Sequence, residues 1–280
     1  MSNYSKSHLF LVFLFLTLSF SGATTFYKKN DDVKVEMITS KGKIVIRLYS
    51  KTEKHKNNFI NLINCGFFEE VLFHRVINNF VAQAGDPNSK LHNFKGNLGE
   101  ESHGETIPAE FFPEYYHKKG VIAAARNPDN VNPLKASSGS QFYLVQGKIY
   151  TELELKNLEA KINLQNEKNQ LNKFFMDPQN ENYTKRYKDC LQSNSQDSIN
   201  LFMQKIKPVI FQEYVPFKFS ELAIKDYTTI GGTPFLDGSY TVYGEVIEGL
   251  DVIDDICIIE TNKMDQPIED VKIIAIKIIE

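Results

Sequence analysis

The sequence predicts a mainly β fold that is interrupted by an α-helical segment. Short apolar runs separated by Gly, Asn and Pro turns make up most of the chain, and only two amphipathic helices lie among them. Residues 151–219 leave this pattern, because their apolar side chains recur at helical spacing. Many short strands joined by tight turns favour an antiparallel barrel or sandwich, into which the helical segment is inserted.

The first 23 residues are typical of a secretory signal peptide. Lys6 precedes an apolar stretch at residues 9–20, and small residues follow at positions 21–23. A membrane-spanning helix needs roughly 20 apolar residues, so this stretch is short for an anchor. The sequence therefore predicts an exported protein, periplasmic or secreted, that begins near Thr24. The alternative is a protein anchored to the membrane by residues 9–20.

A hairpin and a helix are expected next. Residues 33–38 and 44–48 are rich in Val and Ile and flank a turn at residues 40–43. Thr52 then begins a helix that ends at Gly66. The remaining strands are expected at residues 72–77, 80–83, 120–125, 141–145, 240–246 and 271–279, with a short helix at residues 250–257.

Residues 151–219 are predicted to form a helical hairpin or a small bundle. Thr151 and Glu154 form a capping-box pattern at the start of the first helix, which ends at Asp177-Pro178. Further helical pieces are expected at residues 183–191 and from Ser195 up to Pro208.

Composition excludes several classes of protein. The 280 residues are 42% hydrophobic and 24% charged, which are the proportions of an ordinary globular protein. The formal net charge is -3 and no Lys/Arg run is present, which argues against nucleic-acid binding. Three cysteines, Cys65, Cys190 and Cys257, are too few for a disulfide scaffold. We assign them neither a disulfide nor a metal, and expect Cys65 and Cys257 to be buried.

The most informative segment runs from residue 73 to residue 87 and reads FHRVINNFVAQAGDP. It predicts one strand, a tight turn and a second strand. The period of two places Phe73 and Arg75 on the face opposite to His74. An arginine close to Phe80 and Gln83 is a polar group beside an apolar patch. Taken alone, this trio is more typical of structural roles: a salt bridge on a barrel wall, a core aromatic ring and a solvated amide.

This segment closely resembles the signature of the cyclophilins, the peptidyl-prolyl cis-trans isomerases. Two further blocks resemble that family in the same order: residues 123–127 together with 138–144, and residues 232–246. The hairpin at residues 33–48 is similar to the family's opening strands. The resemblance covers most of residues 31–280 apart from the helical segment, and three ordered blocks are more specific than one short motif.

The resemblance implies a closed eight-stranded antiparallel barrel capped by two helices, with a peptide groove on its outer wall. It implies isomerisation of X-Pro bonds without metal or cofactor, by a monomer that acts on proline-containing polypeptides. Arg75 would donate to the prolyl nitrogen, with Phe80 and Gln83 completing the catalytic set. The implied substrate-binding residues are Val81, Ala125, Arg126, Gln141, Tyr143, Phe235, Leu236 and Tyr240.

Several positions depart from the best-known family pattern. Val81 stands where methionine is usual, Arg126 where asparagine is common, Tyr143 where phenylalanine is usual, and Tyr240 where histidine is usual. Phe235 stands where a tryptophan favours the inhibitor cyclosporin, so we expect weak cyclosporin binding.

Several other residues have a simpler structural interpretation. His74 is expected to be structural, because it lies on the strand face opposite Arg75. Residues 138–140 are expected to form a polar turn, since the nucleophile pattern Gly-x-Ser-x-Gly is absent. His92, His103 and His117 lack metal-ligand spacing and are expected at the surface.

Two functions stay open at this point. The first is an exported isomerase that acts on prolyl bonds of folding proteins. The second is a peptide-binding or chaperone module with weak turnover, in which the helical segment contacts a protein partner.

Overall fold

The computed structural model describes residues 31–91, 94–193 and 195–279, so the predicted signal segment at residues 1–23 lies outside the described residues. The strands are β1 (Val33–Thr39), β2 (Gly42–Leu48), β3 (Phe73–Ile77), β4 (Val81–Ala84), β5 (Val121–Ala124), β6 (Phe142–Val145), β7 (Val242–Glu248) and β8 (Ile273–Ile279). In the described ranges, no helix combines the length and the apolar character that a membrane crossing requires.

All eight strands belong to one sheet with the order β3-β4-β6-β5-β7-β2-β1-β8. Each neighbouring pair is antiparallel. The sheet curls so that its two edges meet, where Leu72 pairs with Lys272 and the Phe73 N–H donates to the Val271 carbonyl at 2.8 Å. The predicted eight-stranded antiparallel fold is confirmed, although an isolated bridge and single hydrogen bonds close it in place of a full ladder.

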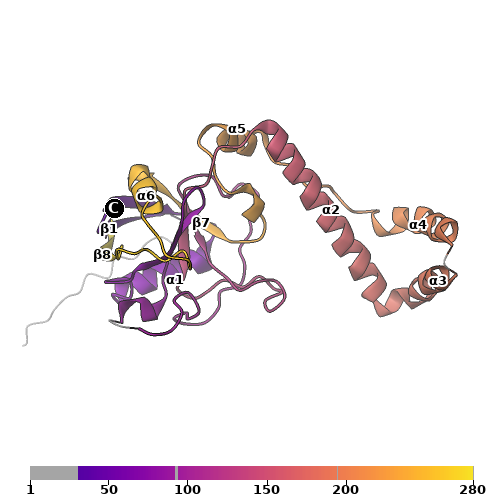
Figure 1. Cartoon of the computed structure of the whole chain (residues 1–280), viewed down its shortest axis with the longest axis horizontal. Coiled ribbons are helices and arrows are strands. Elements are labelled where there is room, and N and C mark those ends of the chain that lie inside the picture. The colour runs from indigo at the N-terminus through magenta and orange to yellow at the C-terminus, as the bar shows by residue number, and fades with distance from the viewer. Residues whose placement is uncertain (1–30, 92–93, 194, 280) are drawn as a thin grey trace, which may run out of the picture.

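Two helices cover the curled sheet, as expected (Figure 1). Helices α1 (Glu53–Asn64) and α6 (Leu250–Cys257) lie on opposite sides of it. Phe59 of α1 and Ile253 of α6 are buried in the same apolar core as the inward-facing residues of the strands. Each large apolar side chain that is fully buried contributes about 1.5–3 kcal/mol relative to its exposed state. This core holds the barrel together.

One strand departs from the simple period of two. The pairing of β3 with β4 shifts register between Phe73 and Arg75. Phe73 therefore enters the same core as Val76, and the expectation that Phe73 shares a face with Arg75 was wrong. A bulge inserts one residue into the alternation, which turns the side chains before it to the other face of the sheet.

A long helical arm projects from the barrel (Figure 1). We use this name for residues 152–219, which contain α2 (Glu152–Met176), α3 (Glu181–Gln192) and α4 (Gln196–Ile210), with α3 and α4 at the far end. The capping box predicted at Thr151 and Glu154 is present. The expectation that the last helix stops before Pro208 was wrong, because α4 continues to Ile210. Pro208 has no N–H to donate to the carbonyl four residues earlier, so α4 lacks one helical hydrogen bond in its last turn.

The root of the arm is packed into the domain. Leu155 of α2, Phe219, Tyr227 and Tyr116 form one buried cluster, and Tyr227 lies on helix α5 (Glu221–Thr229), which sequence reasoning missed. Short 3-10 turns occupy Pro87–Lys90, Pro178–Asn180 and Pro234–Leu236. Leu155 at the start of α2 and the buried face of α5, Ala223 and Tyr227, thus join the arm to the barrel side of the molecule.

The three cysteines differ in exposure. Cys257 is buried as expected, and burial raises the pKa of its thiol to about 12. Cys65 is exposed, so the expectation that it is buried was wrong: it is the C-cap residue after α1, and Leu62 and Ile63 are the residues of the last turn that enter the core.

Candidate active site

The middle strands of the sheet carry apolar side chains on both faces. In β6, Phe142 and Leu144 enter the interior core, whereas Tyr143 and Val145 belong to a second cluster on the outer face. The alternation of side chains along a strand produces this division.

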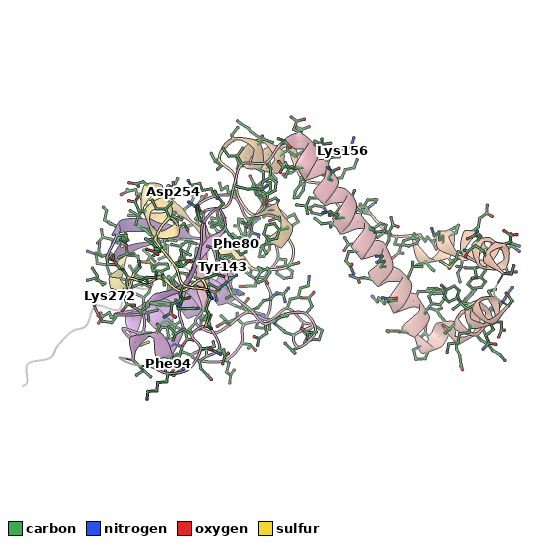
Figure 2. The ribbon with its side chains drawn as sticks, in the orientation of Figure 1. Phe80, Phe94, Tyr143, Lys156, Asp254 and Lys272 are labelled. Carbon is green, nitrogen blue, oxygen red and sulfur yellow. The ribbon has the colours of Figure 1, made fainter. Side chains whose placement is uncertain are left out.

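An outer pocket of about 130 Å³ opens over this second cluster. Nine of the eleven residues implied by the sequence line it: Arg75, Phe80, Val81, Gln83, Ala125, Arg126, Tyr143, Leu236 and Tyr240. Strand register brings several of them together, because Gln83 pairs with Arg75 on one side and with Tyr143 on the other. Phe80 and Tyr143 lie close together near the middle of the barrel in the view of Figure 2.

Arg75 is held at the edge of the outer pocket by neighbouring side chains. Its Nη1 donates to Gln83 Oε1 at 3.3 Å, and its Nε lies 3.8 Å from Asp265 Oδ2. The guanidinium carbon is 5.7 Å from the centre of the Phe80 ring. Its side chain keeps 39% of its surface exposed, so the guanidinium can reach a bound ligand.

Gln141 and Phe235 lie outside the outer pocket. Gln141 is buried behind Gln83, from which its Oε1 accepts a hydrogen bond at 2.8 Å. Its Nε2 donates to the carbonyls of Gly99 and Glu101, so it fixes the orientation of Gln83. Phe235 stacks on Phe80 at a centroid distance of 5.6 Å and extends the apolar rim.

A neighbouring side pocket of about 280 Å³ shares Gln83, Ala125 and Arg126 with the outer pocket. Gln141 is part of the lining of this side pocket. The two pockets thus lie side by side, with these three residues between them.

The floor of the outer pocket rests on a buried polar chain. Asp237 Oδ1 accepts from Nδ1 of His117 at 2.8 Å, which leaves His117 Nε2 to accept from the Tyr143 hydroxyl at 3.0 Å. The other Asp237 oxygen accepts from the Tyr227 hydroxyl at 2.6 Å. Burial raises the pKa of Tyr143 well above its usual value, so the phenol stays neutral.

His117 was expected at the surface, and this expectation was wrong, because the residue is fully buried in that polar chain. No spacing in the sequence indicates the contact, since Asp237 lies 120 positions further along. His103 is exposed as expected, and His92 lies outside the described residues.

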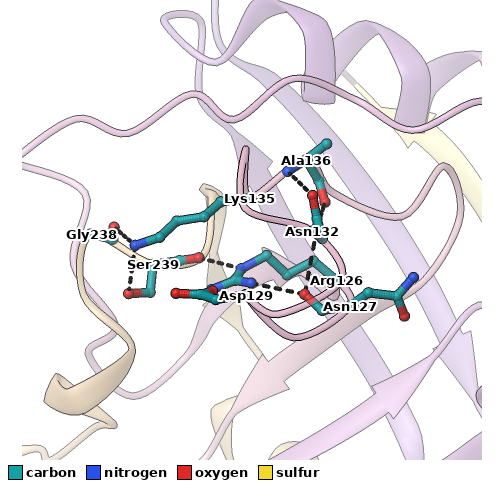
Figure 3. Close-up of polar contacts among 8 residues, drawn as sticks. All are labelled: Arg126, Asn127, Asp129, Asn132, Lys135, Ala136, Gly238 and Ser239. Carbon is teal, nitrogen blue, oxygen red and sulfur yellow. Dashed lines mark hydrogen bonds and ion pairs between the residues drawn. The ribbon is translucent and has the colours of Figure 1, made fainter. Parts of the chain in front are cut away.

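The Arg126 side chain is held by several contacts within the protein (Figure 3). Its Nε donates to the Ser239 carbonyl at 2.6 Å, its Nη2 lies 2.7 Å from Asp129 Oδ1, and its guanidinium carbon is 4.5 Å from the centre of the Tyr240 ring. Lys135 also donates to Gly238 and Ser239. These bonds fasten the loop after β5 to the loop before β7, and they fix the position of Tyr240.

His74 on β3 is buried, and among the described residues its ring nitrogens make no hydrogen bond. Burial lowers its pKa to about 4, so the ring is neutral at pH 7. Its ring packs against the loop at Gly99, where an added Cβ would approach Nε2 to 3.2 Å. In the described parts of the chain, no group of three His, Cys, Asp or Glu side chains is placed to hold a metal ion.

The fold and the outer pocket define a class of protein: a curled antiparallel barrel with an arginine beside an apolar socket on its outer wall. The sequence model of the family "Cyclophilin type peptidyl-prolyl cis-trans isomerase/CLD" matches residues 34–170 and 224–278. The chain therefore belongs to the cyclophilin-type peptidyl-prolyl cis-trans isomerases. The resemblance in the sequence is confirmed, and the enzyme class follows from the family.

Curated relatives agree with this family. A protein of Staphylococcus saprophyticus, named as a peptidyl-prolyl cis-trans isomerase, is 26% identical over 251 residues, covering 89% of this chain and 93% of its own. A protein of Staphylococcus aureus strain USA300 with the same name is 25% identical over 248 residues. A crystal structure of a cyclophilin-type isomerase from Cryptosporidium parvum has a TM-score of 0.52 and 19% identity, covering 89% of this chain and 99% of its own, and shows the likeness of fold.

Proposed function

We propose that the outer pocket isomerises X-Pro bonds, with Arg75 as the group that stabilises the twisted amide. The supporting observation is the position of the Arg75 guanidinium, held by Gln83 at the edge of a socket of apolar side chains. Rotation about an X-Pro bond crosses a barrier of about 18–20 kcal/mol, because it breaks amide resonance. A donor that binds the prolyl nitrogen only when that nitrogen is pyramidal lowers this barrier.

The apolar socket explains why proline would be the preferred residue. Phe80, Val81, Tyr143 and Leu236 offer hydrocarbon and ring surfaces, and a proline ring carries no N–H that such a socket would leave unpaired. Because the Arg126 side chain is already bonded inside the protein, its contact to an extended peptide would come from the backbone at Ala125 and Arg126.

Replacement of Arg75 tests the proposed function. Arg75→Ala should lower kcat/KM for a short X-Pro peptide about 100- to 1,000-fold, because one transition-state donor is lost. Its fold should persist, since the side chain is partly exposed. Arg186→Ala on the exposed surface of α3 is the matched control, and it should keep full activity. Unchanged exchange in a folded Arg75→Ala protein would refute the assignment.

We also propose that the enzyme acts outside the cytoplasm on exported polypeptides. The support is the signal-like pattern of residues 1–23. Mass spectrometry of the protein from its native cells should find an N-terminus near Thr24. A protein that retains residues 9–20 and stays with membranes would favour the anchored alternative.

The helical arm is interpreted as an insertion in the isomerase domain, because the family model leaves residues 171–223 unmatched. A second function for it, the binding of unfolded chains, is favoured by exposed apolar side chains: Met176, Leu191, Leu201 and Val215 are 82%, 48%, 55% and 83% exposed. Suppression of client aggregation that persists in Arg75→Ala and is lost when these residues become polar would support this role. Equal suppression by the wild-type protein and by the variant in which these residues are polar would refute it.

A further inference from the structure

A larger pocket lies on the other side of Tyr240 from the proposed prolyl site. Its volume is about 370 Å³, and Tyr240 lines both this pocket and the outer pocket. Aromatic rings dominate its lining, and we call it the aromatic pocket. Those rings belong to Phe111, Phe112, Tyr115, Tyr116, Phe217, Phe219 and Tyr240.

Its walls come from two parts of the chain. One wall is the loop at residues 110–116, whose Tyr115 packs with the cluster under the outer pocket. The opposite wall is residues 217–223, where the helical arm returns to the barrel. These residues lie in the part of the chain that the family model leaves unmatched. The aromatic pocket is therefore built partly by the arm of this chain.

The wall formed by the arm is held firmly in place. The Phe217 N–H donates to Asn163 Oδ1 at 2.7 Å, and Asn163 Nδ2 donates back to the Phe217 carbonyl at 3.0 Å. The Phe219 N–H donates to Glu159 Oε1 at 2.7 Å, and its ring is buried against Tyr227. The aromatic pocket is thus preformed, so a ligand would not have to order this segment.

The carboxylates in the lining are already bonded. Both oxygens of Asp237 accept hydrogen bonds, from His117 and from Tyr227. Glu110 accepts from the Lys54 N–H through Oε1, and from the N–H and Nδ1 of His55 through Oε2. What the pocket offers a ligand is therefore mainly ring and hydrocarbon surface, which suits a large apolar side chain.

We propose that the aromatic pocket binds a large apolar side chain, aromatic in particular, of the same polypeptide whose proline occupies the outer pocket. This inference rests on the proposed function, and it adds a preference for clients that carry Phe, Tyr, Leu or Met close to the proline. Tyr240 is shared by the two pockets, so their occupants lie next to each other. Because a single side chain, Tyr240, is common to the two pockets and an extended chain advances about 3.3 Å per residue, we take a separation of about two to four residues from the proline.

A peptide series tests the proposal. One peptide carries a single X-Pro bond flanked by Ala and Gly, and its relatives carry one Phe at each position from two to four residues before or after the proline. We expect kcat/KM to rise about tenfold for at least one Phe position, because a buried ring adds binding energy that the short peptide lacks. A uniform response across all positions would overturn the proposal.

Variants separate this pocket from the catalytic site. Phe111 lines the aromatic pocket and is 39% exposed, whereas Phe94 is 37% exposed and lies elsewhere on the barrel (Figure 2). Phe111→Ala should remove most of the gain for the Phe peptide and leave the Ala peptide unchanged, and Phe94→Ala should change neither. Loss of activity toward both peptides in Phe111→Ala, with unchanged thermal unfolding, would overturn the proposal.

The same measurements distinguish failure of the inference from failure of the proposed function. If the wild-type protein isomerises no peptide, the proposed function itself is wrong. If it isomerises all peptides equally well, only the aromatic pocket has been misassigned.

Discussion

Arg75 and Gln83 face each other across paired strands, and Arg75 Nη1 donates to Gln83 Oε1 over 3.3 Å. Gln83 in turn donates to the buried Gln141 at 2.8 Å. Gln83→Leu should therefore lower kcat/KM for X-Pro peptides about tenfold, because Arg75 loses the acceptor that orients it. Gln83→Glu retains an acceptor for Arg75 and should recover part of that loss. Equal activity of Gln83→Leu and wild type in a peptide exchange assay would show that Arg75 needs no orienting partner.

Tyr143 lines the outer pocket with its ring, and its hydroxyl donates to the buried His117. Tyr143→Phe keeps the ring but leaves the Nε2 of the buried His117 without its donor. We expect a loss of about 1–3 kcal/mol in the free energy of unfolding, with kcat/KM reduced less than about threefold. Urea unfolding and a peptide assay on the same preparation measure both quantities. A stability equal to that of the wild type would mean that water replaces the hydroxyl.

His74 should make the protein acid-sensitive. Its pKa is lowered to about 4 by burial, whereas an unfolded chain has a histidine pKa of about 6.5. The unfolded state therefore binds more protons between these values, so stability is full above pH 6.5 and falls as the pH drops toward 4, by on the order of 3 kcal/mol. Urea unfolding of His74→Phe across this range should show a shallower dependence on pH. Parallel curves would assign the acid sensitivity to other groups.

The helical arm should tolerate truncation at its far end and not at its root. Replacement of residues 170–212 by a short Gly-Ser linker removes α3 and α4 and should leave a folded barrel with unchanged activity on short X-Pro peptides. Deletion of residues 151–218 also removes Leu155, which is buried with Phe219 and Tyr227. That larger deletion should lower the melting temperature strongly or give insoluble protein. Equal thermal stability of the two proteins would contradict the role of this cluster.

Local patterns predicted much of the molecule because the forces behind them are local. The alternation in residues 33–48 gave the opening hairpin, since a strand with one buried face must alternate. The capping box at Thr151 marked the start of α2, since both partners lie within four residues. Nine of the eleven residues implied by the resemblance line one pocket, because the strand register that joins Arg75, Gln83 and Tyr143 belongs to the family fold.

The sequence by itself determined the strands, the first and last helices, and the set of residues around Arg75. The tertiary structure decided which polar groups are buried: His117 lies under the outer pocket because Asp237 reaches it from a distant loop. It also decided that Phe73 turns inward at a bulge and that the root of the arm builds the aromatic pocket beside Tyr240. Such features depend on contacts between residues far apart in the chain, which no local period encodes.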